Sequence, residues 1–131
     1  MIVITKQVNA GKTQDAVIEA LAAVNSGMST LFVTCEATPE NIAGRVAHEC
    51  QISGVDLTQS APMTIIHATT VTELKAKLFD FARKDAEFDV IVVDCNYAVS
   101  RPEWFNLLQQ LENDGFEIVA TQQVVRAPKA K

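Results

Sequence analysis

The sequence alternates between short runs rich in β-branched residues and longer segments with helical spacing, and this alternation constrains the fold more than any other feature. Five short runs are apolar at consecutive positions, which is typical of strands covered on both faces. They occupy residues 2–5, 30–36, 64–68, 89–95 and 116–121. Because helical segments separate them, the pattern predicts an α/β domain of three layers (α/β/α) with a five-stranded, mainly parallel sheet.

The intervening segments carry the start and stop signals of helices. Residues 12–25 are rich in alanine and leucine, and Gly27 follows as a stop signal. Thr38 and Pro39 predict the N-cap and first position of a second helix. Two further helices are expected to begin with capping boxes, in which a hydroxyl and a later carboxylate satisfy backbone N–H groups. These boxes are Thr70 with Glu73 and Ser100 with Glu103.

Length and composition limit the architecture and the partners. With 131 residues, 48% of them hydrophobic, the chain is expected to form one domain over residues 1–125 and a short basic tail over 126–131. No apolar run reaches the roughly 18 residues of a membrane span, and no signal peptide is recognisable, so we expect a cytoplasmic protein without a membrane partner. The net charge of −5 argues against a broad nucleic-acid-binding surface.

The three cysteines, Cys35, Cys50 and Cys95, are widely spaced and form no CxxC pair. The sequence therefore predicts neither a disulfide framework nor a zinc site. Cys35 and Cys95 end apolar runs, which indicates reduced, buried thiols.

A candidate phosphate loop lies between the first predicted strand and the first predicted helix. Gly11, Lys12 and Thr13 match the end of the P-loop pattern GxxxxGK[ST]. In such a loop, the glycine lets backbone amides approach phosphate oxygens, the lysine carries a positive charge to them, and the threonine hydroxyl binds Mg²⁺. Lys6 occupies the place of the first glycine of the pattern. The alternative is an ordinary strand-to-helix turn with an exposed lysine.

Polar residues stand at the ends of three other predicted strands. Asp94 closes an apolar run, as does the carboxylate that holds Mg²⁺ through water in P-loop enzymes, although it could also cap a turn. Glu36 would project from the same sheet edge and could deprotonate the water that attacks a γ-phosphate, or it is a solvated acid at a helix entry. Gln123, after the fifth run, could sense the γ-phosphate.

Taken together, four stretches resemble the RecA-like ATPase core, and most closely the motor domain of DnaB-type replicative helicases. These stretches are ITKQVNAGKT, TLFVTCEATPENIAGRV, DVIVVDC and IVATQQVVR. Arg45 corresponds to the arginine of the helicase segment in which a strand ends in Ser-Leu-Glu-Met. Gln123 and Arg126 correspond to the Gln-x-x-Arg of the sensor strand. The resemblance covers almost the whole chain and implies the strand order 5-1-4-2-3.

The resemblance also implies ATP and Mg²⁺ as cofactors and assigns roles to the site. Glu36 is then the catalytic base and Gln123 the sensor, while Thr13 and Asp94 hold the metal. The nucleotide-binding residues are Ala10, Gly11, Lys12, Thr13 and Arg126. The implied function is ATP binding with slow hydrolysis, in a homo-oligomer or with a larger helicase or recombinase partner.

Other functions remain open at this stage. The sequence shows no counterpart of the collar domain, linker helix and trans-acting arginine finger of a replicative helicase. This favours, as an alternative, a degenerate and non-catalytic module that mimics or regulates a helicase or recombinase. A small nucleotide or metabolite kinase is a third interpretation. DNA contact rests on residues 96–101 alone, where Tyr97 could stack on a base and Arg101 could meet a phosphate, unless this loop is simply packed.

Overall fold

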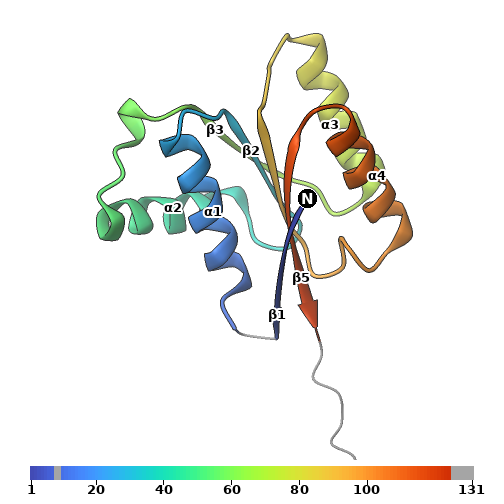
Figure 1. The fold of residues 1–131 in the computed structure, drawn as a ribbon, viewed down its shortest axis with the longest axis horizontal. Coiled ribbons are helices and arrows are strands. Elements are labelled where there is room, and N and C mark those ends of the chain that lie inside the picture. Colours follow the sequence, from blue (N-terminus) through green and yellow to red (C-terminus); the bar gives the residue numbers. More distant parts are fainter. Residues whose placement is uncertain (8–9, 125–131) are drawn as a thin grey trace, which may run out of the picture.

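The computed structural model describes residues 1–7 and 10–124 of the chain, and these residues form a parallel sheet with helices on both faces (Figure 1). Strands and helices alternate, as the sequence pattern predicts. The strands are β1 (Ile2–Gln7), β2 (Thr30–Thr34), β3 (Met63–His67), β4 (Val90–Asp94) and β5 (Glu117–Val124). The helices are α1 (Lys12–Asn25), α2 (Pro39–Ser53), α3 (Val71–Arg83) and α4 (Pro102–Asn113), with a short 3₁₀ turn at Leu57–Gln59.

All strand pairs are parallel, and the order across the sheet is β1-β5-β4-β2-β3. The implied order 5-1-4-2-3 is therefore wrong, because β5 lies between β1 and β4. The burial of the two strands reflects this order. Residues 118–121 of β5 are fully buried, whereas Ile2 and Val3 of β1 remain 47% and 40% exposed. The charged Lys6 suits β1 to the edge of the sheet, whereas β5 carries no charged residue after Glu117 and takes the interior position, which is covered on both faces and both edges.

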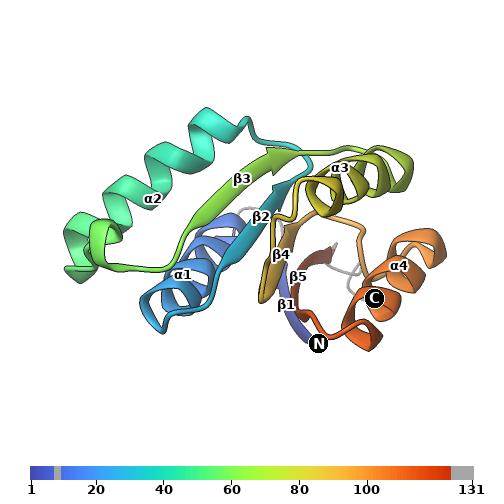
Figure 2. The same cartoon turned by 90° about the horizontal axis from the view of Figure 1, so that it is seen from above.

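Two pairs of helices lie on opposite faces of the sheet (Figure 2), and each pair covers a hydrophobic cluster. On one face, α1 and α2 cover Phe32, Val92 and Val119. On the other face, α3 and α4 cover a cluster that includes Val33 and Ile91. Each fully buried aliphatic side chain contributes about 1.5–3 kcal/mol of hydrophobic stabilisation before the cost of ordering it.

The helix starts follow the sequence signals with one exception. Thr38 and Thr70 are N-caps whose hydroxyls accept hydrogen bonds from backbone N–H groups three residues later, at 3.1 Å in both cases. The capping box predicted at Ser100 is wrong. The N-cap of α4 is Arg101 without a side-chain cap, and the Ser100 hydroxyl instead donates to the Tyr97 carbonyl at 3.2 Å. Pro102, which fits the first turn of a helix, moves the start one residue along.

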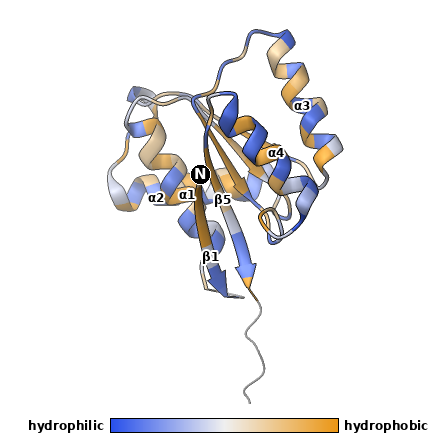
Figure 3. Ribbon diagram, turned by 45° about the vertical axis from the view of Figure 1, so that its right-hand side comes forward, coloured by the Kyte–Doolittle hydropathy of each residue, from blue (hydrophilic) through white to orange (hydrophobic). Residues whose placement is uncertain are grey.

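Figure 3 shows where polar residues enter this apolar framework. The strands are hydrophobic along most of their length, and β1 and β5 become hydrophilic toward their carboxyl ends. Polar side chains of several parallel strands therefore meet at one edge of the sheet. Within the described residues, no helix is long and apolar enough to cross a membrane.

Candidate functional site

A polar pocket of about 290 Å³ opens at the carboxyl edge of the sheet. Its walls come from β1, the start of α1, the segments after β2 and β4, helix α2 and the end of β5. The lining residues are Gln7, Gly11, Lys12, Thr13, Gln14, Glu36, Arg45, Asn96 and Gln123. The structure thus brings together six residues that the sequence analysis singled out, from segments up to about a hundred positions apart.

Gly11 forms the N-cap of α1 and gives the pocket its backbone wall. Its φ of 88° lies in the left-handed region, which a glycine adopts without steric cost. Among the described residues, no side chain caps this end of α1. The first N–H groups of the helix have no intrahelical acceptor and carry the positive end of its dipole, so this wall is suited to an anion.

Asp94, at the end of β4, accepts hydrogen bonds from three side chains. Lys12 Nζ donates to Asp94 Oδ1 at 2.6 Å, and Thr13 Oγ1 donates to Oδ2 at 2.8 Å. From β5, Thr121 Oγ1 donates to Oδ1 at 2.8 Å. The side chain of Asp94 is 4% exposed and that of Lys12 is 11% exposed, so the ion pair is largely shielded from water. Buried charges require such pairing, because an isolated carboxylate is costly to desolvate.

Glu36, Arg45 and Gln123 line the same pocket as Lys12 and Thr13. Arg45 is fixed to its own helix, because its Nε donates to Asn41 Oδ1 at 3.0 Å. Gln123 is fixed through its backbone, whose N–H donates to the Asn96 carbonyl at 3.2 Å. The pocket therefore combines a carboxylate, a guanidinium and an amide with the N-terminus of α1.

The sequence reasoning missed three pocket residues: Gln7, Gln14 and Asn96. The Asn96 Oδ1 atom is buried and has no hydrogen-bond partner among the described residues. Such an orphaned acceptor is uncommon in folded proteins. The position of Asn96, two residues after Asp94, could have identified it as a pocket residue. Residues that follow a buried strand at the carboxyl edge lie on the ligand-binding side of a parallel sheet.

Some sequence-selected residues do not line the pocket. Lys6, which replaces the first glycine of the P-loop pattern, lies within β1 and forms an ion pair with Asp15 at 3.0 Å. The backbone N–H of Ala10 donates to the Gln7 carbonyl at 3.1 Å, and the residue contributes no pocket wall. Arg126 lies outside the described residues.

In the loop at residues 96–101, which the sequence offered for DNA contact, Tyr97 and Arg101 contact each other and neighbouring protein residues. The Arg101 guanidinium lies 4.0 Å from the centre of the Tyr97 ring, and the Tyr97 hydroxyl donates to the Thr69 carbonyl at 3.2 Å. Tyr97 also packs edge-on against Trp104. This geometry fits the alternative of a packed loop better than that of a base-stacking loop.

Two thiols lie beside the site at the ends of β2 and β4. Cys35 and Cys95 are both buried, as predicted, and none of the three cysteines forms a disulfide. A hydrogen bond between the two thiols lowers the pKa of Cys95 to about 7 and raises that of Cys35. Both side chains belong to the core on the α3 and α4 face, so we assign them a packing role.

The donor set around Asp94 is compatible with Mg²⁺ but not with a metal held by protein alone. Among the described residues, no group of three or more His, Cys, Asp or Glu side chains gathers. The Thr13 hydroxyl and the Asp94 carboxylate are neighbouring oxygen groups, and Asn96, whose Oδ1 atom is buried, lines the same pocket as Thr13. Mg²⁺ in nucleotide sites is typically bound by one or two protein oxygens, substrate phosphates and water.

A comparison with protein-family models finds no match to this sequence, and a comparison with curated protein sequences finds none either.

Proposed function

We propose that this protein binds ATP with Mg²⁺ in the polar pocket and hydrolyses it slowly, as a minimal P-loop NTPase with a three-layer, RecA-like core. The proposal includes assembly with itself or with a larger helicase or recombinase partner of DNA replication or recombination. It rests above all on one observation: Lys12 and Thr13 both contact Asp94, directly beside the uncapped start of α1.

This arrangement supports a phosphate site because each group has a matching task. The Lys12 ammonium neutralises phosphate charge, and the backbone amides after Gly11 donate hydrogen bonds to phosphate oxygens. Thr13 and Asp94 would hold Mg²⁺ through their side-chain oxygens, and the ion would supply positive charge to neutralise the charge that develops on the phosphate oxygens. On phosphate binding, Lys12 turns from Asp94 toward the ligand.

Three further residues of the pocket, Glu36, Arg45 and Gln123, support hydrolysis. Glu36 accepts the proton of the attacking water, and its exposed side chain in the pocket lining lets water reach it. Arg45 stabilises negative charge on the terminal phosphate, and Gln123 hydrogen-bonds to it. The sensor role is supported by the place of Gln123 near the end of β5, where it lines the same pocket as Lys12 and Thr13.

Calorimetric titration with ATP and Mg²⁺ tests the binding step. We expect wild-type protein and the Gln109→Ala control, whose side chain is exposed on α4 away from the pocket, to bind equally. We expect Lys12→Ala to lose binding, with circular dichroism showing that the variant is folded. Absence of heat and of competition by a fluorescent ATP analogue for the wild type contradicts the proposal.

A second candidate is the non-catalytic interaction module, and a specific observation favours it. Lys12, Thr13 and Thr121 satisfy the Asp94 carboxylate through protein contacts, and Lys6 forms an ion pair with Asp15. The network could therefore be purely structural. In that case, a folded Lys12→Ala variant retains full function in cells, whereas the ATPase proposal requires its loss.

A further inference from the structure

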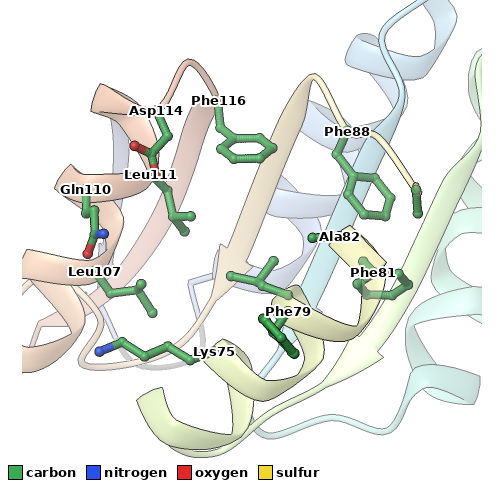
Figure 4. A pocket seen from close by; sticks show the side chains of 12 residues that line it. Lys75, Phe79, Phe81, Ala82, Phe88, Leu107, Gln110, Leu111, Asp114 and Phe116 are labelled. Atoms are coloured by element: carbon green, nitrogen blue, oxygen red, sulfur yellow. The ribbon is translucent and has the colours of Figure 1, made fainter. Parts of the chain in front are cut away.

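An apolar groove of about 550 Å³ lies between α3 and α4, away from the polar pocket (Figure 4). Four of the six phenylalanines of the chain line it. Phe88 and Phe116 precede β4 and β5, so the groove opens near the amino edge of the sheet, opposite the carboxyl edge that forms the candidate site. The candidate function leaves this groove unused.

The wall formed by α3 presents an exposed aromatic ring. Phe79 is 67% exposed, the highest value among the large hydrophobic side chains of the described residues. Figure 4 shows it on α3, beside Lys75 and across the groove from α4. A phenylalanine in this position gains hydrophobic free energy only when another surface covers it.

The two walls carry opposite charges. On α3, Lys75 lines the groove, and Arg83 follows Phe79 by one helical turn on the same side. On α4, Asp114 lines the groove, and Glu103 precedes Leu107 by one turn. None of these four side chains forms an ion pair with another described residue. The remaining charges of α3 pair along the helix, as Glu73 with Lys77 and Asp80 with Lys84.

We propose that this groove is a homodimer interface, in which α3 of each copy lies against α4 of the other. A two-fold axis parallel to the groove exchanges the walls, so the basic α3 wall meets the acidic α4 wall twice. Such self-complementarity is the requirement for an isologous interface. Because α3 and α4 run in the same direction, Lys75 then faces Glu103 of the second copy, and Arg83 faces Asp114 of the second copy.

The charges select this axis over the other possible one. A two-fold axis perpendicular to the groove would set α3 against α3 and α4 against α4, which brings like charges together at both walls. Such juxtaposition is unfavourable in an interface. With the parallel axis, the Phe79 ring of each copy enters the groove of the other and becomes the apolar anchor of the dimer.

Charge reversal of one wall at a time tests the proposal by sedimentation equilibrium on the full chain. The acidic variant carries Lys75→Glu and Arg83→Glu, and the basic variant carries Glu103→Lys and Asp114→Lys. We expect wild-type dimers, monomers for each variant alone, and heterodimers when the two variants are mixed. The swap Asp80→Lys with Lys84→Asp, on the outer side of α3, serves as the control and should leave the dimer unchanged.

Phe79→Ser tests the apolar anchor separately. Because the ring is exposed, the substitution should leave the circular dichroism spectrum intact and raise the dimer dissociation constant at least about tenfold. A wild-type protein that stays monomeric at millimolar concentration overturns the proposal. A dimer that persists in both charge variants, or two monomeric variants that do not pair on mixing, also overturns it.

Discussion

Lys12 and Asp94 are 82 residues apart in the sequence, and an ion pair of 2.6 Å joins Lys12 Nζ to Asp94 Oδ1. The lysine stands at the start of α1, and the aspartate ends β4. Their contact links the candidate phosphate loop to the centre of the sheet. A substitution of either residue is therefore expected to lower the free energy of unfolding.

Asp94→Ala should destabilise the protein by about 3 kcal/mol, because it removes the partner of a largely buried ammonium. Urea unfolding of Asp94→Ala, Lys12→Ala and the double variant checks this as a double-mutant cycle. We expect the double variant to lose clearly less than the sum of the single losses. Additive losses would show that the two charges do not interact in solution.

Glu36→Gln should retain ATP binding and lose hydrolysis by roughly 10²–10⁴-fold, because the amide cannot accept a proton from water. Single-turnover measurement of phosphate release, alongside calorimetric binding, separates the two effects. Glu40→Gln is the matched control, since Glu40 is an exposed acid in the first turn of α2 and does not line the pocket. Equal loss of binding and turnover in Glu36→Gln argues against Glu36 as the base.

Gly11→Ala should cost about 1–2 kcal/mol of stability, because φ is 88° at this position and a Cβ disfavours the left-handed region. Gly44→Ala is the matched control. Gly44 lies inside α2 with open space around the position of a Cβ, so alanine there should stabilise the helix by about 0.5–1 kcal/mol. Thermal unfolding of both variants measures the difference. Equal shifts in the same direction would contradict the assignment of strain to Gly11.

Glu73 should make stability depend on acid pH. The backbone N–H of Thr69 donates to the Glu73 carboxylate and lowers its pKa from the usual 4.5. Because the folded pKa is depressed, this stabilisation is present above pH 4.5 and disappears as the pH falls through the folded value. Chemical unfolding from pH 3 to 6 should show a weaker pH dependence for Glu73→Gln than for the wild type. An unchanged dependence in that variant contradicts the capping role.

Much of the local structure was predictable from the sequence because it depends on neighbouring residues. The strand cores, the helix over 12–25 and the caps Thr38 and Thr70 follow from periodicity and local hydrogen bonding. The capping box that was wrongly predicted at Ser100 also has a local explanation. Arg101 became the N-cap because Pro102 suits the first turn, and two nearby start signals competed.

The candidate site was only partly predictable. Residues at the ends of parallel strands meet at one edge, so the grouping of Lys12, Thr13, Glu36 and Gln123 around one pocket follows from the strand pattern. The third partner of Asp94 did not follow from it. Thr121 reaches Asp94 because β5 lies next to β4, and the expected strand order did not include that pairing.

The sequence alone therefore established the alternation of strands and helices, the parallel sheet and the edge at which polar residues gather, since all three arise from short-range periodicity and the direction of the chain. Tertiary packing established the order of the strands, the self-contained network around Asp94 and the groove between α3 and α4. These features depend on which strands occupy the interior of the sheet and on the distance at which α3 and α4 pack. Both depend on apolar contacts between residues far apart in the sequence, and a local sequence pattern does not determine such contacts.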